Sequence, residues 1–367
     1  MRVLVMGGTQ FNGLALVREL VRTGHDVTVL NRGRTDARLP RSVRRLHGDR
    51  TDRDRLRELL ADEEFDCVQD MSAYHPEDVE MMIELLDGKV GHYVFISSTV
   101  IYAPSDVLPI TEDHPVERGP EQNEYGLHKL LCEDLLVRAH RERGFPATTV
   151  ALSMVFGPHN ALPDREQRMF VRLLTGRPVL IPGDGTALSQ VGHVDDQARA
   201  LRMLMGKPVT FGKRYNLTGS QYFSDEGYVD TFASVLGVEP NKVFVPAEVM
   251  DAAWDGRLEL DLGGAPRMTM DIRSSDVARR RGVATRTRYQ LATLVQKLAP
   301  HLHRWNRSVV FSIDRLRRDV GWEPEYTFRS MVEQTYEWWC SMGLDRTQRF
   351  DFTFEDQLLA HVEGSKR

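Results

Sequence analysis

Cysteine is scarce in this chain, which has only three among its 367 residues. Cys67, Cys132 and Cys340 lie far apart, so neither a disulfide framework nor a zinc-binding cluster is indicated. Long apolar runs are also missing, and no stretch approaches the about 20 apolar residues that a membrane-spanning helix needs. The chain enters a strand-like pattern at once, without the features of a cleavable signal. We therefore expect a protein of the reducing cytoplasm with no membrane partner.

An excess of basic residues is absent as well. The 48 lysines and arginines are outnumbered by 53 aspartates and glutamates, which gives a formal net charge of −5 at pH 7. This balance provides no electrostatic footprint for a nucleic acid. Hydrophobic residues make up 41% of the chain and charged residues 28%. Length and composition thus predict a globular protein with two domains, or with one large domain and a satellite.

A glycine-rich turn at residues 6–13, Met-Gly-Gly-Thr-Gln-Phe-Asn-Gly, follows an apolar segment and precedes an amphipathic helical pattern. Strand, turn and helix in this order are typical of a dinucleotide-binding unit, whose helix N-terminus faces the pyrophosphate. Gly7 would permit the tight turn, and Gly13 would let the helix pack closely. Gln10 replaces the usual middle glycine, and an ordinary β-turn-α corner is the alternative. The predicted cofactor contacts in this turn are Gly7, Thr9, Gln10, Phe11, Asn12 and Gly13.

Segments after the following strands supply further candidate contacts to the cofactor. Where such units usually carry an acidic residue for the adenosine ribose, this chain has Asn31, whose amide can still bind a hydroxyl. Arg32 and Arg34 follow, and an arginine can stack on adenine or bind a 2′-phosphate, which leaves NAD and NADP open. Asp49 either accepts a hydrogen bond from adenine or caps a turn. The residues that follow the next strand should also lie near the cofactor, namely Met71, Ser72 and Ala73.

Strand and helix patterns alternate along the chain. Such alternation predicts an α/β fold with a doubly wound parallel sheet. The expected strands lie at residues 3–5, 26–30, 65–71, 92–98 and 214–218. The expected helices lie at residues 53–61, 76–86, 125–143, 195–205, 224–236, 311–320 and 327–339.

Tyr125 and Lys129 open a long helical segment, and their spacing places both side chains on one helix face. An ammonium beside a phenol favours the phenolate and lowers the phenol's pKa from its ordinary value of about 10. Tyrosine then becomes a usable general base near neutral pH. Tyr-x-x-x-Lys is common by chance. It gains weight here because it follows a strand that ends in Ser97 and Ser98, in a chain that opens with a nucleotide turn.

Eight motifs in one order carry a resemblance to a known family. They are Gly7…Gly13, Ser98…Tyr102, Tyr125…Lys129, Val155-Phe-Gly-Pro158, Gly183-Asp-Gly-Thr186, His193-Val-Asp-Asp196, Tyr215-Asn-Leu217 and Gly321-Trp-Glu-Pro324. This set resembles the extended short-chain dehydrogenase/reductase family, the nucleotide-sugar epimerases and dehydratases. It covers most of the chain except about residues 244–310. The Gly-Gly-Thr-x-Phe-x-Gly turn is similar to an atypical branch, some members of which have lost the catalytic tyrosine and bind cofactor or RNA instead.

The resemblance implies a Rossmann sheet and a smaller C-terminal α/β substrate-binding domain. It places the NAD(P)-binding domain at residues 1–176, with a return strand at about residues 209–218. The substrate-binding lid would comprise residues 177–208 and 219–367. No metal is implied.

The resemblance also implies roles for three residues. Tyr125 would remove a hydroxyl proton while hydride leaves the same carbon for the nicotinamide. Lys129 would hold the nicotinamide ribose and keep Tyr125 acidic. Ser98 would donate a hydrogen bond to the reacting oxygen. The ketone formed in this way could be reduced on its other face, lose a neighbouring group, or leave oxidised.

One departure from the family pattern bears on the reaction. Sugar 4,6-dehydratases of the family carry an Asp-Glu pair directly after the serine, where this chain has Thr99 and Val100. Valine cannot transfer a proton, so an ordinary 4,6-dehydratase is disfavoured and Thr99 is expected only to contact the substrate. A dehydratase of another kind would need another base, for which the candidates are Asp70, Glu121, Glu124, His128 and His193.

A second departure bears on the substrate. Nucleotide-sugar enzymes of the family usually place an arginine for the diphosphate where this chain has Ser189, a neutral candidate contact, followed by Gln190. A serine offers one neutral hydrogen bond in place of a charged bidentate clamp. The arginines that could replace the clamp are Arg165, Arg168, Arg267 and Arg307.

We therefore expect an NAD-dependent enzyme that oxidises a sugar hydroxyl transiently, as an epimerase or a non-standard dehydratase. The sugar-containing substrate need not carry a diphosphate, as in a nucleoside or a sugar of secondary metabolism. NAD is favoured over NADP because Asn31 can serve a ribose hydroxyl. The alternatives are a net NAD(P)-dependent oxidoreductase and a non-catalytic nucleotide- or RNA-binding protein. A homodimer is expected through the helices at residues 76–86 and 125–143, whose apolar stripe includes Leu130, Leu131, Leu135 and Leu136.

Overall fold

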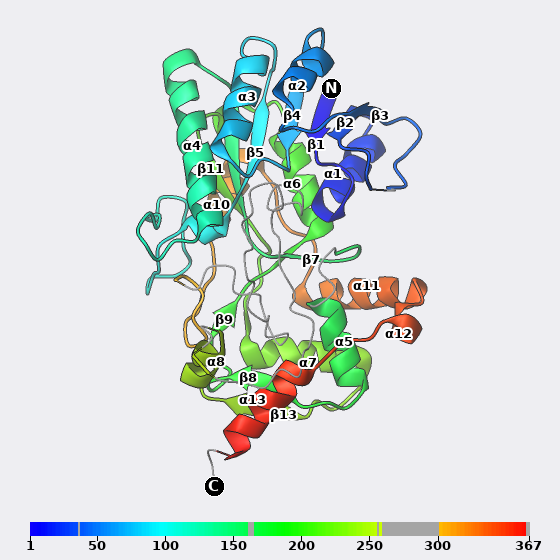
Figure 1. Ribbon diagram of the computed structural model, residues 1–367, viewed down its shortest axis with the longest axis vertical. Helices are drawn as coiled ribbons and strands as arrows, with labels where there is room; N and C mark the ends of the chain where they lie inside the picture. Colours follow the sequence, from blue (N-terminus) through cyan, green and yellow to red (C-terminus); the bar gives the residue numbers. More distant parts are fainter. Residues whose placement is uncertain (36, 161–164, 255–256, 259–300, 365–367) are drawn as a thin grey trace. The chain divides into compact units, whose positions relative to one another are not determined.

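The computed structural model describes residues 1–35, 37–160, 165–254, 257–258 and 301–364 (Figure 1). Within these ranges the chain forms two compact units. The first unit comprises Met1–Ala161, Gln190–Gln221 and Val310–Thr327, and the second comprises Leu162–Ser189, Tyr222–Val309 and Phe328–Arg367. None of the helices in the described ranges is long and apolar enough to cross a membrane.

A seven-stranded parallel sheet forms the centre of the first unit, in the order β11-β6-β5-β4-β1-β2-β3. Its strands are β1 (Arg2–Met6), β2 (Asp26–Asn31), β3 (Arg44–His47), β4 (Cys67–Asp70), β5 (Tyr93–Ser98), β6 (Ala147–Leu152) and β11 (Arg214–Leu217). The strand order reverses between β1 and β4. A doubly wound sheet binds its ligand at such a reversal, beyond the carboxyl ends of the strands. The predicted α/β fold is confirmed.

Helices cover both faces of this sheet. Along β1, Val3 and Val5 pack on one face and Leu4 and Met6 on the other, because successive strand residues point to opposite sides. The first face is covered by α1 (Phe11–Arg22), α6 (Val194–Leu204) and α10 (Asp314–Val320). The second face is covered by α2 (Arg53–Leu60), α3 (Pro76–Leu86) and α4 (Glu124–Arg143). The shorter elements of this unit are η1 (Thr99–Ile101), η2 (Pro208–Thr210) and the parallel pair β7 (Val155–Phe156) and β10 (Gly192–His193).

The second unit combines two small sheets with helices. Its strand pairs are β8 (Val179–Pro182) with β13 (Lys242–Val245), which are parallel, and β9 (Leu188–Ser189) with β12 (Phe223–Ser224), which are antiparallel. Its helices are α5 (Glu166–Leu174), α7 (Asp225–Leu236), α8 (Ala247–Trp254), α11 (Phe328–Ser341), α12 (Leu344–Thr347) and α13 (Thr353–Gly364). Phe170 of α5 packs against Phe232 of α7 and Trp339 of α11, with ring centroids 5.3 and 5.4 Å apart.

The predicted strands and helices are present, with ends that shift by a few residues. The largest shift concerns the helix expected from residue 311, which begins at Asp314 as α10. The residues before it are extended and pair with Ile110 instead. The N–H of Ile110 donates to the carbonyl of Val310 (2.8 Å), and the N–H of Ser312 donates to the carbonyl of Ile110 (2.9 Å). This long-range pairing replaces the first helical turn.

The division into units differs from the predicted domain boundaries. Residues 190–208 belong to the first unit, because α6 packs beside α1 on the sheet. Arg202 of α6 donates to Glu19 of α1 (2.8 Å), and Gln69 of β4 donates to the carbonyl of Leu201 (3.0 Å). Residues 165–176 belong to the second unit, where α5 is tied to α13.

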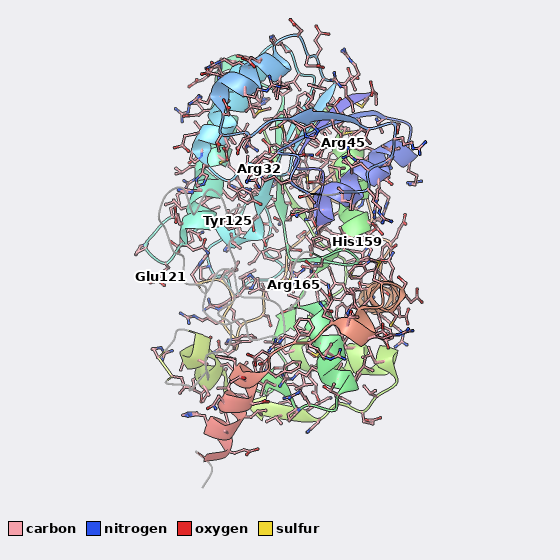
Figure 2. All side chains as sticks on the ribbon, turned by 45° about the vertical axis from the view of Figure 1, so that its right-hand side comes forward. Arg32, Arg45, Glu121, Tyr125, His159 and Arg165 are labelled. Carbon is pink, nitrogen blue, oxygen red and sulfur yellow. The ribbon has the colours of Figure 1, made fainter. Side chains whose placement is uncertain are left out.

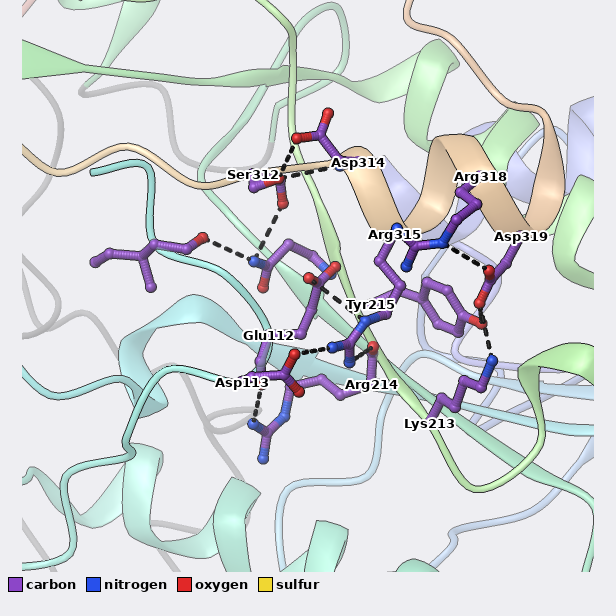
Figure 3. A network of polar contacts seen from close by, with 12 residues as sticks. Glu112, Asp113, Lys213, Arg214, Tyr215, Ser312, Asp314, Arg315, Arg318 and Asp319 are labelled. Atoms are coloured by element: carbon purple, nitrogen blue, oxygen red, sulfur yellow. Dashed lines mark hydrogen bonds and ion pairs between the residues drawn. The ribbon is translucent and has the colours of Figure 1, made fainter. Parts of the chain in front are cut away.

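A polar network anchors the loop that connects η1 with α4 (Figure 3). Asn216 of β11 donates its backbone N–H to Glu112 (3.0 Å) and accepts a hydrogen bond from the Tyr102 hydroxyl (2.6 Å). Arg315 of α10 forms ion pairs with Glu112 (3.7 Å) and with Asp113. The residues after Ser98 are therefore held to β11 and α10 before the chain turns into α4.

Candidate active site

The glycine-rich turn between β1 and α1 has the backbone that the sequence predicts. Gly7 has a φ of 87°, in the left-handed region that favours glycine. A Cβ on Gly13 would lie 2.3 Å from the carbonyl oxygen of Gly7, so α1 packs this close to the turn only because glycine stands there. A Cβ on Gly7 would lie 3.0 Å from the Cβ of Ser72 and 3.7 Å from that of Met71. The first turn and the end of β4 thus meet at the reversal of strand order, as predicted.

The turn fits the pyrophosphate of a dinucleotide. Helix α1 begins at Phe11, and among the described contacts the side chain of its N-cap, Gln10, makes no capping hydrogen bond. The first N–H groups of a helix lack partners within it and attract anions. The buried Oδ1 of Asn12 has no hydrogen-bond partner among the described residues, and as an acceptor it suits a hydroxyl donor of a ligand rather than the pyrophosphate. Thr9 lies between the glycines and these groups and is partly exposed.

The candidate adenosine contacts lie after β2 and β3. Asn31 accepts a hydrogen bond from the N–H of Gly33 with its Oδ1 (2.8 Å), so its amide N–H₂ is the group suited to a ribose oxygen. Arg32 is partly exposed and Arg34 is exposed on the loop after β2; Figure 2 labels Arg32. Asp49 accepts from the N–H (3.1 Å) and hydroxyl (2.8 Å) of Thr51. The turn-capping alternative for Asp49 is therefore observed.

Ser98 and Tyr125 meet at the carboxyl end of β5. Ser98 is the last residue of β5, and Tyr125 lies in the first turn of α4 (Figure 2). Asn123 begins that helix by accepting the N–H of Gly126 with its Oδ1 (2.8 Å). Ser98 lies near enough to Tyr125 that hydrogen bonding from its hydroxyl acts to lower the pKa of Tyr125. Ser98 and Tyr125 thus lie near each other, and their roles in the reaction stay predictions.

Lys129 lies one turn further along α4 and is only 2% exposed. Its Nζ donates to the carbonyls of Ala73 and Ile96, each at 2.7 Å. The rings of Tyr74 and Phe95 lie 4.8 and 4.9 Å from the same nitrogen. Burial lowers the pKa of Lys129 to about 8. An ammonium has three donors, and two are used here, which leaves the third for a ligand.

The predicted effect of Lys129 on Tyr125 is wrong for this structure. Burial raises the pKa of Tyr125 above its ordinary value, Tyr74 adds to the rise, and the hydrogen bond with Ser98 lowers it. The ammonium of Lys129 lies 5.7 Å from the ring centroid of Tyr125 and is directed at two backbone carbonyls. Desolvation therefore prevails over the expected attraction.

Glu133 is a residue of this region that sequence reasoning missed. It accepts a hydrogen bond from the Ser97 hydroxyl (2.5 Å) and one from Nε of Arg214 (2.7 Å). Ser97 directly precedes Ser98, so this contact fixes α4 against β5 beside Ser98. The signal in the sequence is the spacing, because Tyr125, Lys129 and Glu133 follow one another at intervals of four on one helix face.

The alternative proton-transfer candidates do not resemble a general base. Asp70 accepts hydrogen bonds from Arg50 (2.8 Å) and the Tyr93 hydroxyl (2.6 Å), and although burial acts to raise its pKa, Arg50 holds it low. Glu121 and Glu124 are exposed. His193 is buried and stacked on Tyr326 (ring centroids 3.6 Å apart), and His128 lies 4.0 Å from Glu124. Thr99 and Val100 are buried in η1, directly after Ser98.

The candidate clamps for a diphosphate fall in the second unit or outside the described residues. Ser189 lies in β9, while Gln190 is buried and bound to the carbonyl of Gly219 (2.6 Å). Arg168 is committed to Glu355 of α13, with Nε–Oε1 and Nη2–Oε1 distances of 3.0 and 2.7 Å. The remaining candidates are Arg165, which pairs with Glu166 (3.2 Å), Arg307, which donates to the carbonyl of His301 (3.4 Å), and Arg267, which lies outside the described residues.

Comparison with known proteins relates the chain to a stem-loop binding protein and to a reductase. It is 28% identical over 373 residues to the chloroplast stem-loop binding protein of 41 kDa b from Arabidopsis thaliana, covering 98% of this chain and 84% of that protein. It is 29% identical over 251 residues to 2′-dehydrokanamycin reductase from Streptomyces kanamyceticus, covering 68% and 70%.

A solved structure shares the fold across nearly the whole chain. The dTDP-glucose 4,6-dehydratase from Bacillus anthracis, in complex with NAD, superposes with a TM-score of 0.68 at 15% identity, covering 93% of this chain and 97% of that one. The profile described as NAD dependent epimerase/dehydratase family matches residues 3–218, well over half of the chain and most of the first unit. The resemblance carried by the eight motifs is confirmed: this chain belongs to the NAD dependent epimerase/dehydratase family.

Proposed function

We propose that this protein is an NAD-dependent enzyme that oxidises a sugar hydroxyl transiently, as an epimerase or a non-standard dehydratase. The pair of Ser98 and Tyr125 beside Lys129 carries the proposal, because Ser98 ends β5, the strand next to β4, and so lies beside the point where the strand order reverses. In this role Tyr125 accepts the hydroxyl proton and later returns it. Ser98 donates a hydrogen bond to the reacting oxygen, and Lys129 gives its third N–H to the nicotinamide ribose.

The raised pKa of Tyr125 is compatible with this role once the cofactor is bound. NAD supplies a hydride acceptor and a positively charged ring, and a cation beside a phenol favours the phenolate. The turn at Gly7 and Gly13 supports the pyrophosphate, and Met71 and Ser72 line the same edge. The chain's own residues therefore provide both binding and proton transfer, and the cofactor provides the electron sink.

Two other functions have an observation in their favour. A net oxidoreductase is supported by the likeness to 2′-dehydrokanamycin reductase, which extends over 68% of this chain. RNA binding is supported by the likeness to the stem-loop binding protein, which extends over 98% of this chain. The site retains Tyr125 and Lys129, which a purely RNA-binding protein does not need, and the net charge of −5 does not favour a polyanion.

The amount of NADH formed for each molecule of product distinguishes these three functions. The protein is incubated with NAD and a panel of free sugars, nucleosides, sugar phosphates and nucleotide sugars, with NMR for products and absorbance for NADH. An epimerase or dehydratase yields a new sugar without net NADH, because the hydride returns to the sugar within each turnover, to the oxidised carbon in an epimerase and to the carbon that has lost a neighbouring group in a dehydratase. One NADH per product indicates the oxidoreductase. No turnover together with tight binding of an RNA stem-loop indicates the non-catalytic function.

NAD is expected to bind more tightly than NADP. Asn31 can donate to a ribose hydroxyl, and its Oδ1 is already used by Gly33. Arg32 and Arg34 are the residues that would favour a 2′-phosphate. Calorimetric titration of the protein freed of cofactor, with each dinucleotide in turn, compares the two affinities. Binding of NADP about tenfold tighter than NAD, abolished by substitution of Arg32 or Arg34, would reverse this assignment.

We also propose a homodimer formed through α3 and α4. Leu130 and Leu136 are buried in the chain's own core and Leu135 packs at its edge, whereas Leu131 is 38% exposed on α4. An exposed leucine beside an apolar helix pair suits a contact with a second copy. Light scattering should give twice the mass of one chain, and Leu131→Glu should lower it to that of a monomer. A wild-type monomer at micromolar concentration would contradict the dimer.

A further inference from the structure

A buried arginine joins three segments around the cofactor site. Arg50 lies in the loop between β3 and α2, and its guanidinium reaches the end of β4, with its side chain only 13% exposed. Nη1 donates to Oδ1 of Asp70 (2.8 Å) and to the hydroxyl of Ser72 (3.0 Å), while Nη2 donates to Oδ2 of Asp70 (3.1 Å). Nε lies 3.2 Å from Asp78 in the first turn of α3. One side chain thus ties together the loop, β4 and α3.

Asp70 links Arg50 to the backbone segment that binds Lys129. Its Oδ1 accepts the N–H groups of Ser72 (3.1 Å) and Ala73 (3.0 Å). The carbonyl of Ala73 accepts the hydrogen bond from Nζ of Lys129. Ala73 is therefore held on one side by the Arg50–Asp70 pair and on the other by Lys129. The mechanism above uses neither Arg50 nor Asp70.

We propose that Arg50 is a positioning residue for the cofactor site, which acts through Asp70 to hold Ser72 and Ala73 so that Lys129 keeps its third N–H donor for NAD. The inference rests on the proposed function in taking NAD as the ligand of Lys129. A buried ion pair is often no more stabilising than apolar residues of the same volume, so stability alone does not account for it. Its value lies in fixing the geometry of the end of β4.

The charges of Asp70 and Arg50 shift the pKa of Lys129 in opposite directions. Beyond the dominant effect of burial, Asp70 acts to raise the pKa of Lys129, and Arg50 acts to lower it. The titratable and charged groups that face Lys129 are Cys132, Asp70, Arg50, Asp78, Tyr74 and Tyr125. Neutral Lys129 would have two N–H donors, both taken by the carbonyls of Ala73 and Ile96. NAD affinity should therefore fall as the pH rises through this pKa.

The test compares Arg50→Met and Asp70→Asn with the wild type. NAD is titrated by calorimetry from about pH 6 to about pH 9, across the range where Lys129 ionises. The pH at which affinity falls should move up by about one unit in Arg50→Met and down by about one unit in Asp70→Asn. Both variants should bind NAD roughly tenfold more weakly at neutral pH, because Ser72 and Ala73 lose their restraint. Loss of packing alone would move the pH at which NAD affinity falls in the same direction in both variants.

Hydrogen exchange supplies a readout that needs no NAD. Deuterium uptake in the segment of Ser72 and Ala73 should quicken in Arg50→Met, while the core strands stay protected. The matched control is Arg57→Met, which removes an arginine from α2 whose partner is the exposed Glu84 (2.8 Å). This control should leave exchange and NAD affinity unchanged.

The double variant Arg50→Met with Asp70→Leu covers the case in which a single variant does not fold. It removes both buried charges at once, so it should fold, and its pH midpoint should return near that of the wild type while exchange at Ser72 and Ala73 stays fast. Unchanged exchange in the Arg50 variants, or equal shifts of both single variants, overturns the inference. If the wild type binds no NAD, the proposed function fails, and the exchange measurement still decides the role of Arg50.

Discussion

Tyr125→Phe is expected to lower kcat by about 10²–10⁴-fold on the sugar that the wild type converts, which is the usual contribution of a positioned acid–base group. The variant keeps the ring, whose centroid lies 6.2 Å from that of Tyr74, and removes only the hydroxyl whose pKa Ser98 acts to lower. The dissociation constant for NAD should stay close to that of the wild type, because the glycine-rich turn and Lys129 provide the main contacts proposed for the cofactor. Turnover is measured by product NMR and binding by calorimetry.

The matched control for this experiment is a substitution of the neighbouring tyrosine, Tyr74. Tyr74→Phe also removes one hydroxyl from a ring beside Lys129, whose Nζ lies 4.8 Å from the Tyr74 ring. Tyr74→Phe should keep most of the activity, since the contact with the ammonium uses the face of the ring. The opposite pattern, with Tyr125→Phe active and Tyr74→Phe inactive, would move the proton-transfer role to Tyr74. Two active variants would contradict the mechanism as a whole.

Those parts of the first unit whose structure depends on residues close in the sequence could be predicted from the sequence. The helix at residues 76–86 is found with the same bounds as α3, because Pro76 begins it and its apolar residues recur at helical spacing. Gly7 and Gly13 could be assigned their roles because a tight turn and a close approach of helix to strand both demand glycine. Strand and turn patterns then place Ser72 and Ser98 at the same edge of the sheet.

What the sequence could not predict depends on contacts between distant residues. The placement of α6 in the first unit depends on its packing against α1, where Arg202 meets Glu19. The direction of the Lys129 ammonium depends on two backbone carbonyls, which no residue type reveals. For this reason the spacing of Tyr125 and Lys129 was a sound guide to their proximity and a poor guide to the pKa of the phenol.

The substrate is expected to be a sugar without a diphosphate. Ser189 stands where family members place an arginine for that group, and a serine cannot supply the paired, charged hydrogen bonds that recognise phosphate. Arg168, one possible substitute, is buried and bound to Glu355 at 2.7 Å, and withdrawing it would leave that buried carboxylate with Arg172 alone (3.0 Å). In a thermal-shift screen with NAD present, free sugars, nucleosides or aminoglycoside-like sugars should therefore stabilise the protein more than UDP-, dTDP- or GDP-sugars.

The variant Ser189→Arg tests this expectation through a gain in affinity. Ser189→Arg should raise the affinity for a nucleotide sugar by roughly tenfold or more, because a hydrogen bond to a charged group contributes about 1.5–3 kcal/mol. Ser189→Ala is the matched control and should change little, since it removes only a neutral hydroxyl. If diphosphate sugars alone stabilise the wild type, and substitution of Arg267 or Arg307 removes that stabilisation, the clamp has moved to another position and the substrate is a nucleotide sugar. An arginine introduced at position 189 would then be redundant, so the response of Ser189→Arg distinguishes a missing clamp from a relocated one.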